Sequence, residues 1–78
     1  MITVKYFGEI AEATNCSEEQ VTTQSNKLSD LIDALSLKHN LERFPMIIAL
    51  NQNLIDLSDE ININNKDELA ILPPFAGG

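Results

Sequence analysis

The sequence predicts an α+β fold, with one main helix packed on one face of a mixed sheet of four to five strands. Two patterns and one motif lead to this prediction. Residues 28–35 carry apolar side chains at helical spacing, and strand-like segments lie near both ends of the chain. Residues 72–78 read Leu-Pro-Pro-Phe-Ala-Gly-Gly. Because 78 residues, 44% of them hydrophobic, suffice for one modest core, we expect one domain over residues 1–72 and an extended, flexible tail over residues 73–78.

The first predicted element is a half-buried strand over residues 1–7. Alternation places Ile2, Val4 and Tyr6 on one face and Thr3, Lys5 and Phe7 on the other. After Gly8, residues 9–13 are rich in helix formers and predict a short helical or irregular turn. Residues 19–23 have β-propensity but few apolar side chains, which predicts a short edge strand.

The main helix is predicted over residues 27–39. Its apolar stripe has the spacing i, i+3, i+4 and i+7 and comprises Leu28, Leu31, Ile32 and Leu35. Asn26 is the candidate N-cap. Lys38 and His39 fall in the last turn, where cations favour the helix dipole, and we expect His39 to be a solvated cation there.

The second half of the chain predicts three strands, at residues 46–50, 54–55 and 68–72. The first two form a hairpin around Asn51-Gln52-Asn53, whose residues tolerate left-handed backbone. A polar loop then leads to a short extended piece at residues 61–64 and to a turn at residues 64–67. The last strand runs directly into the prolines.

We place the first and last strands side by side and parallel at the centre of the sheet, because they are the longest alternating segments. This is the arrangement of a ubiquitin-like β-grasp. It predicts that Phe7, at the end of the first strand, lies near Leu72 at the base of the tail.

Charge and cysteine content exclude several classes of function. A formal charge of −7, from 12 acidic against 5 basic residues, argues against nucleic-acid binding and favours a partner with a basic docking surface. The single Cys16 cannot form an internal disulfide and indicates a reducing compartment. Without a signal-like segment or a membrane-length apolar run, we expect a cytoplasmic protein that binds no membrane. Asp56, Asp59 and Glu60 lack the spacing of a calcium loop, so no metal site is predicted.

The sequence contains no catalytic cluster of side chains, which points to the C-terminus as the working group. Pro73 and Pro74 cannot continue a strand ladder and fix their own φ, so they predict a stiff stalk. Gly77 and Gly78 have no side chains and can pass through a narrow channel. Fully extended, residues 73–78 reach on the order of 20 Å, which suits insertion into a partner's active site.

Four segments carry a family resemblance: Val4-Lys5-Tyr6-Phe7, Leu50-Asn51, Asp67-Glu68-Leu69-Ala70, and Leu72-Pro73-Pro74 with the closing Gly77-Gly78. Through them the chain resembles, over essentially its whole length, the small sulfur-carrying subunit of molybdopterin synthase, the MoaD family. A Gly-Gly alone would be weak evidence for this resemblance. The specific match is the pair of prolines three residues before it, directly after a strand.

The resemblance implies that the chain is a co-substrate and not an enzyme on its own. Gly78 would be adenylated by a separate E1-like activating enzyme, which uses ATP, and then converted to a thiocarboxylate. The tail would enter the active site of the large catalytic subunit, within a heterotetramer, and give its sulfur to cyclic pyranopterin monophosphate in molybdenum cofactor biosynthesis. No cofactor is expected on the chain itself.

The resemblance also assigns the partner-binding residues, which are Phe7, Pro73, Pro74, Phe75, Ala76 and Gly77. Phe7 is a candidate interface anchor because its strand face lies opposite the expected core. The alternative is that it covers a second small core under residues 9–13. Two departures from the family pattern stand out. Phe75 is bulkier than the expected small β-branched residue, and the turn usually built on Asp-Gly is Asn64-Asn65-Lys66, where we expect asparagine to supply the left-handed conformation.

Three other functions stay open. A sulfur carrier of thiamine biosynthesis uses the same chemistry, and a ubiquitin-like protein modifier passes the activated glycine to a lysine. A binding module makes no use of the Gly-Gly end. One residue added after Gly78 separates these classes, because only the binding module should tolerate it.

Overall fold

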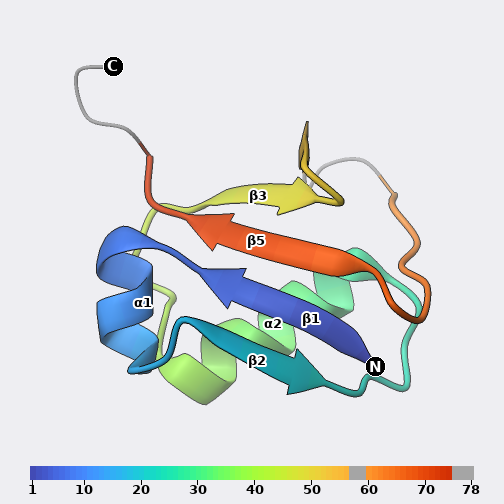
Figure 1. The fold of residues 1–78 in the computed structure, drawn as a ribbon, viewed down its shortest axis with the longest axis horizontal. Coiled ribbons are helices and arrows are strands. Elements are labelled where there is room, and N and C mark those ends of the chain that lie inside the picture. Colours follow the sequence, from blue (N-terminus) through green and yellow to red (C-terminus); the bar gives the residue numbers. More distant parts are fainter. Residues whose placement is uncertain (57–59, 75–78) are drawn as a thin grey trace.

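The computed structural model describes residues 1–56 and 60–74 of the chain (Figure 1). In chain order its elements are β1 (Ile2–Tyr6), α1 (Gly8–Thr14), β2 (Glu18–Val21), α2 (Leu28–His39), β3 (Ile47–Leu50), β4 (Asn53–Ile55) and β5 (Glu68–Leu72). These described strands form one mixed sheet in the order β2-β1-β5-β3-β4. The predicted α+β architecture is confirmed, and the segment after Gly8 is a second, short helix.

The parallel pair β1 and β5 lies at the centre of the sheet, as predicted. Val4 is paired with Leu69 and Tyr6 with Ile71, and the Phe7 N–H donates to the Ile71 carbonyl at 3.1 Å. Phe7 therefore lies beside the end of β5, where Leu72 leads into the tail. β2 forms one edge of the sheet beside β1, and the hairpin of β3 and β4 completes the other side.

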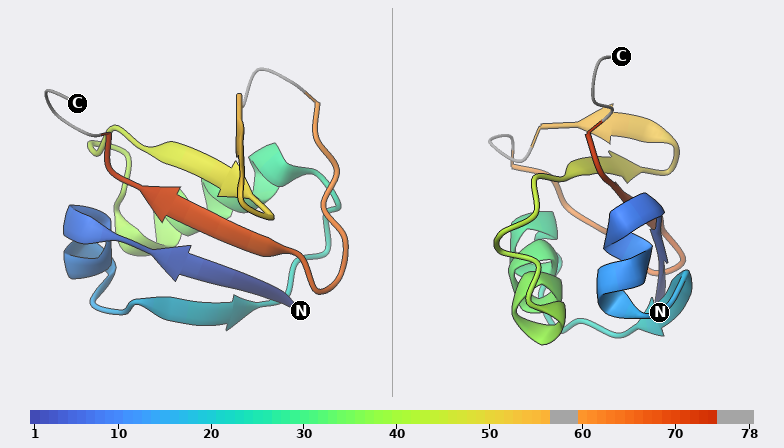
Figure 2. Two further views of the ribbon diagram at one scale, coloured as in Figure 1. Left: turned by 45° about the horizontal axis from the view of Figure 1, so that its top comes forward. Right: turned by 90° about the vertical axis from the view of Figure 1, so that its left-hand side faces the viewer.

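The core lies between the sheet and α2, which crosses behind the strands in Figure 1. All four residues of the predicted helical stripe are buried, and so are Ile2, Val4 and Tyr6 of β1. Figure 2 shows α1 at the end of the sheet where β1 ends; its Ile10 joins the same core. Each fully buried aliphatic side chain contributes about 1.5–3 kcal/mol to stability.

The start of α2 differs from the prediction. Its N-cap is Lys27 and not Asn26, and no side chain caps the first turn. The carbonyl of Asn26 instead accepts from the Ile63 N–H at 2.8 Å, which holds the extended piece at residues 61–63 against the sequence before the helix. Ser25 Oγ accepts from the Lys27 N–H at 3.1 Å and donates to the Asp30 carboxylate at 2.7 Å. A tertiary contact thus moves the helix start by one residue.

Two tight turns precede β4 and β5. Asn51 and Gln52 have φ of 51° and 72°, so the predicted left-handed hairpin turn is confirmed. In the turn before β5 the prediction is wrong, because the left-handed residue is Lys66, with φ of 75°, and not an asparagine. Asn64 is held in place by Asp67, whose carboxylate accepts the Asn64 N–H at 2.7 Å, and the turn reverses at Lys66.

No helix in residues 1–56 and 60–74 combines the length and the apolar character needed to cross a membrane.

Candidate functional site

The base of the tail lies where β1 ends and β5 leaves the sheet (Figure 1). β5 ends at Leu72, and Pro73 follows it half-buried while Pro74 is exposed. The remaining site residues predicted from the sequence lie outside the described residues: Phe75, Ala76, Gly77 and Gly78. The structure therefore places Phe7, Pro73 and Pro74 of the predicted partner-binding set together.

Gly8 lies against Pro73 at the tail base. Its φ is +56°, a conformation that disfavours any side chain, and a Cβ built on it would lie 2.9 Å from Pro73 Cγ and 3.4 Å from Pro73 Cδ. The sequence analysis treated Gly8 only as the end of a strand. The predicted parallel pairing already placed Phe7 beside Leu72, and extending that pairing by one residue would have placed Gly8 beside Pro73.

Phe7 is 44% exposed at the same corner of the molecule. Both polar backbone groups of Phe7 are hydrogen-bonded. The N–H donates to the Ile71 carbonyl, and the carbonyl accepts from the N–H groups of Ile10 and Ala11 at 3.1 and 3.3 Å. Its side chain is not among those that pack against the main core. The residue thus has a fixed backbone and an uncovered aromatic ring, which favours the interpretation as an interface anchor over the second-core alternative.

An apolar outer face continues from the tail base across the sheet, on the side opposite α2. Ladder pairing sets Leu72 opposite Ile47, Ala70 opposite Ala49, and Ala49 opposite Leu54. We define the apolar outer face as Ile47, Ala49, Leu54, Ala70 and Leu72; Leu54 is 74% exposed. Ile47, Ala70 and Leu72 are half-buried and Ala49 is buried, so the exposed part of this apolar patch is centred on Leu54. Exposed apolar patches are typical of binding sites. Leu54 was not predicted as a site residue, because its place opposite Ala49 follows only once β4 begins at Asn53 and not at Leu54 as expected.

The other half of the outer face is polar. Lys5 forms an ion pair with Glu68 at 3.1 Å, and Gln20 donates to Thr3 Oγ1 at 2.8 Å. These side chains extend over β2, β1 and the start of β5. The apolar outer face thus lies on the half of the sheet that adjoins the tail.

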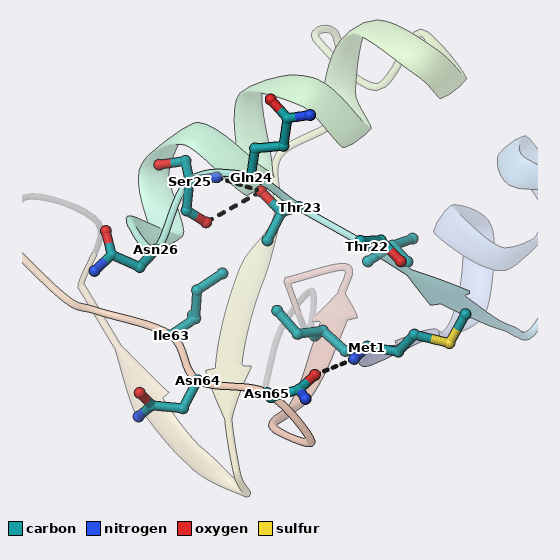
Figure 3. A pocket seen from close by; sticks show the side chains of 11 residues that line it. Met1, Thr22, Thr23, Gln24, Ser25, Asn26, Ile63, Asn64 and Asn65 are labelled. Atoms are coloured by element: carbon teal, nitrogen blue, oxygen red, sulfur yellow. Dashed lines mark hydrogen bonds between the residues drawn. The ribbon is translucent and has the colours of Figure 1, made fainter.

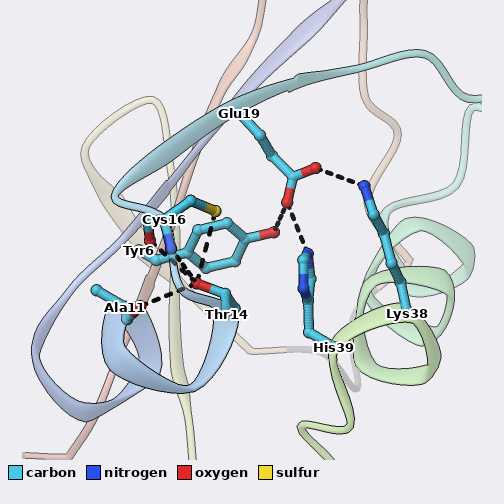
Figure 4. Close-up of polar contacts among 7 residues, drawn as sticks. All are labelled: Tyr6, Ala11, Thr14, Cys16, Glu19, Lys38 and His39. Carbon is cyan, nitrogen blue, oxygen red and sulfur yellow. Dashed lines mark hydrogen bonds and ion pairs between the residues drawn. The ribbon is translucent and has the colours of Figure 1, made fainter.

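A polar cluster around Glu19 joins β2 to the end of α2 (Figure 4). The Glu19 carboxylate accepts from Tyr6 OH at 2.6 Å, from Lys38 Nζ at 2.8 Å and from His39 Nε2 at 2.7 Å. The Tyr6 and His39 rings also meet edge to face, with centroids 5.5 Å apart. The prediction that His39 is solvated is wrong, because its side chain is only 13% exposed. Both basic residues of the last turn, Lys38 and His39, contact the Glu19 carboxylate.

Burial alone raises the pKa of Glu19, but hydrogen bonds from Lys38, Tyr6 and His39 outweigh it and lower the pKa to about 2. Burial, and then the hydrogen bond to the Glu19 carboxylate, raise the pKa of Tyr6 far above its ordinary value of 10.0. The hydrogen bond to Glu19 raises the pKa of Lys38. Glu19 is therefore an ionised carboxylate that accepts hydrogen bonds from three side chains. This arrangement stabilises the contact between β2 and α2.

The end of the sheet opposite the tail has a hollow of about 250 Å³ between Met1, the connection from β2 to α2, and residues 63–65 (Figure 3). The Met1 amino group donates to Asn65 Oδ1 across it. Apart from that amino group, its lining carries only apolar, hydroxyl and amide groups.

Among the residues that the structure describes, no group of three or more histidine, cysteine or acidic side chains could hold a metal ion. Of the acidic loop considered in the sequence, Asp59 lies outside the described residues. Cys16 is a free, half-buried thiol whose Sγ contacts Thr14 Oγ1 at 3.6 Å.

Known proteins are similar to this chain over nearly its whole length. The sequence profile of the ThiS family matches residues 4–78. A molybdopterin synthase sulfur carrier subunit from Anopheles gambiae is 38% identical over 73 residues, covering 90% of this chain and 80% of that protein. SAMP1, the small archaeal modifier protein 1 of Haloferax volcanii, superposes with a TM-score of 0.78 at 26% identity, covering 99% of this chain and 98% of that one.

A second similar structure is a complex of subunits 1 and 2 of the molybdopterin-converting factor from Helicobacter pylori. The superposition has a TM-score of 0.69 at 29% identity and covers 99% of this chain and 97% of that one. Together with SAMP1, this likeness confirms the ubiquitin-like β-grasp that the order and direction of the strands predicted.

Proposed function

The chain belongs to the ThiS family, and from that premise we propose that it is the sulfur carrier subunit of a molybdopterin synthase. The names of its curated relatives support the proposal, since proteins from Anopheles gambiae and Drosophila melanogaster called molybdopterin synthase sulfur carrier subunit are 38% and 37% identical to it. The structural observation that carries the proposal is the tail base. β5 delivers Pro73 and Pro74 out of the sheet beside an exposed Phe7 and the apolar outer face.

In the proposed cycle, a separate E1-like activating enzyme binds the tail and ATP. A carboxylate oxygen of Gly78 attacks the α-phosphorus of ATP, pyrophosphate leaves, and an acyl-adenylate forms. A sulfur donor then attacks the acyl carbon and displaces AMP, which leaves a C-terminal thiocarboxylate. This chain supplies the reacting carbonyl group and binds no cofactor of its own.

In the second half of the cycle, the loaded tail enters the large catalytic subunit. There the thiocarboxylate sulfur forms a C–S bond to cyclic pyranopterin monophosphate as a C–O bond of that substrate breaks. Water then hydrolyses the acyl–sulfur bond, which leaves the sulfur on the product and returns the Gly78 carboxylate. The chain thus contributes a nucleophile, while acid, base and phosphate-binding groups belong to the partner. We assign the docking of that partner to Phe7 and the apolar outer face, because Phe7 and Leu54 are exposed apolar side chains and the face adjoins the tail.

The test is the intact mass of the purified chain after incubation with ATP, the activating enzyme and a sulfide donor. Replacement of oxygen by sulfur adds about 16 Da, and fragmentation should place it at Gly78. A matched chain with one alanine added after Gly78 should gain no mass. If the chain ending at Gly78 also gains none while a known carrier does in the same reaction, sulfur carriage is wrong for this protein.

A second candidate function is protein modification, and the likeness to SAMP1 favours it. The same acyl-adenylate would then pass to a lysine amine, with loss of AMP and formation of an isopeptide bond. Conjugates of higher mass, resistant to reducing agents and hydroxylamine, would support this candidate. A carrier of thiamine biosynthesis would be loaded with sulfur in the same way but would not convert cyclic pyranopterin monophosphate with the large subunit.

A further inference from the structure

Within residues 1–56 and 60–74, no strand pairs with the outer side of the β2 backbone. β2 is the outermost described strand next to β1. The Tyr6 N–H donates to the Ser17 carbonyl at 2.9 Å, and hydrogen-bonded pairs alternate along an antiparallel ladder. Glu19 and Val21 therefore bond toward β1, while the backbone N–H and carbonyl groups of Glu18 and Gln20 point away from the sheet. These outward groups form a template for another strand.

A groove runs beside that free edge, between β2 and α2. Its volume is about 320 Å³. Val21 lines it from the strand, and Leu31, Ala34 and Leu35 line it from the helix. Lys38 closes one end by reaching from α2 to Glu19 of β2. A strand added at this edge would direct every second side chain into the groove, over apolar floor atoms.

The charges at the outer edge of β2 determine which kind of partner strand can pair with it. Glu18 is exposed, and its carboxylate forms no ion pair with any described residue. It faces the solvent side of the sheet, so it would neighbour the outward side chains of an added strand. A second copy of this chain paired through β2 would bring the acidic residues Glu18 and Glu19 of both copies close together, and like charges destabilise such a pairing. The edge therefore favours a foreign strand with basic residues.

We propose that the free edge of β2 and the groove beside α2 bind an extended segment of a partner protein, apolar at alternate positions and basic between them. The segment pairs with the backbone of Glu18 and Gln20, and its apolar side chains lie over Val21, Leu31 and Ala34. Because β1 separates β2 from β5, the tail base and the apolar outer face stay uncovered (Figure 1). This site is independent of the chemistry at the tail, and it allows a second partner while the tail is engaged.

The test is titration of the full chain, labelled with ¹⁵N, with a capped seven-residue peptide alternating lysine and valine. The Glu18 and Gln20 amide signals should shift most, with smaller shifts at Ala34. A peptide with glutamate in place of lysine should bind at least about tenfold more weakly. Gln20→Pro removes the outward N–H and leaves the bonds to β1, so it should weaken binding about tenfold, whereas Gln20→Ala should not.

A second pair of variants keeps the test decisive if proline disturbs the strand. Ala34→Gln places a longer side chain in the groove and should weaken binding, while Leu37→Gln alters an exposed position of the same helix outside it and should not. Absence of binding at millimolar peptide overturns the proposal. So do shifts centred on β4 or the tail base, and so does concentration-dependent self-association through β2.

Discussion

The Glu19 cluster and the tail base lie in the same small domain and are built in opposite ways. At Glu19, each strong polar group has its partner within the chain, with three donors on one carboxylate. At the tail base, Phe7 and Leu54 are exposed within the part of the chain that the structure describes, and the supporting contact is a bare glycine against a proline ring. The comparison separates the groups that hold the fold from those that the fold presents to other proteins.

The largest effect on stability should come from Glu19→Ala. It leaves the Tyr6 hydroxyl and the His39 ring half-buried without their acceptor, at a cost of about 3 kcal/mol in the free energy of unfolding. Urea denaturation measures it. The matched variant Glu18→Ala, one residue away on the exposed face, should change stability by less than about 0.5 kcal/mol. Equal losses in the two variants would contradict the internal role of the cluster.

The same cluster predicts a pH dependence. Because the pKa of Glu19 is lowered from 4.5 to about 2 by folding, its contribution is complete above pH 4.5 and is lost as pH falls toward 2. The slope of unfolding free energy against pH in that window should be smaller in Glu19→Gln than in the unsubstituted chain. An unchanged slope would mean that Glu19 titrates alike in the folded and unfolded states.

The next effect tests the contact at the tail base. Gly8→Ala should cost about 2 kcal/mol, since the left-handed backbone disfavours a side chain and the new Cβ meets the Pro73 ring. In the double variant with Pro73→Ala, the ring atoms are gone and only the backbone term remains. The loss should then be smaller than the sum of the two single losses. Strict additivity would show that the Gly8 contact with Pro73 carries no energy.

A smaller effect, on binding and not on stability, is expected for Phe7→Ala. If Phe7 is an interface anchor, the affinity for the large subunit falls about tenfold while the midpoint of urea denaturation stays unchanged. Titration calorimetry with the large subunit measures the first quantity. Reduced stability with unchanged affinity would restore the second-core interpretation of this residue.

The smallest effect on binding is expected for a substitution in the apolar outer face. Leu54→Gln should weaken binding of the large subunit about threefold, because Leu54 lies toward the rim of the apolar outer face. Leu37→Gln is its matched control, since Leu37 is equally exposed, at 74%, but lies on α2. Equal effects in both variants would show that the apolar outer face has no special part in binding.

The sequence predicted the framework because its signals are local. Alternation in residues 2–6, the stripe of α2 and the hairpin turn each depend on neighbours in the chain, and β5 matched its expected range. The parallel placement of β1 and β5 followed from choosing the two longest alternating segments. For the candidate site, the same placement correctly brought Phe7 to the tail base.

The contacts that sequence reasoning missed join distant residues. His39 looked like a solvated helix-end cation because its partner Glu19 precedes it by 20 residues, on a strand whose facing was unknown. The requirement for glycine at position 8 depends on its contact with Pro73, which lies far away in the sequence. Lys66 adopts the left-handed turn position despite its type, because Asp67 already holds Asn64.

The parallel pairing of β1 and β5 also determines how the molecule responds to force. β1 begins beside Met1 and β5 ends beside Pro73, so pulling on the two ends of the chain drives adjacent strands past each other. The hydrogen bonds between them are then strained together in shear and do not open one at a time as in a zipper. Tension applied between the two ends of the chain therefore loads the β1–β5 ladder in shear, and the domain should stay folded under a force that would unzip an antiparallel pair.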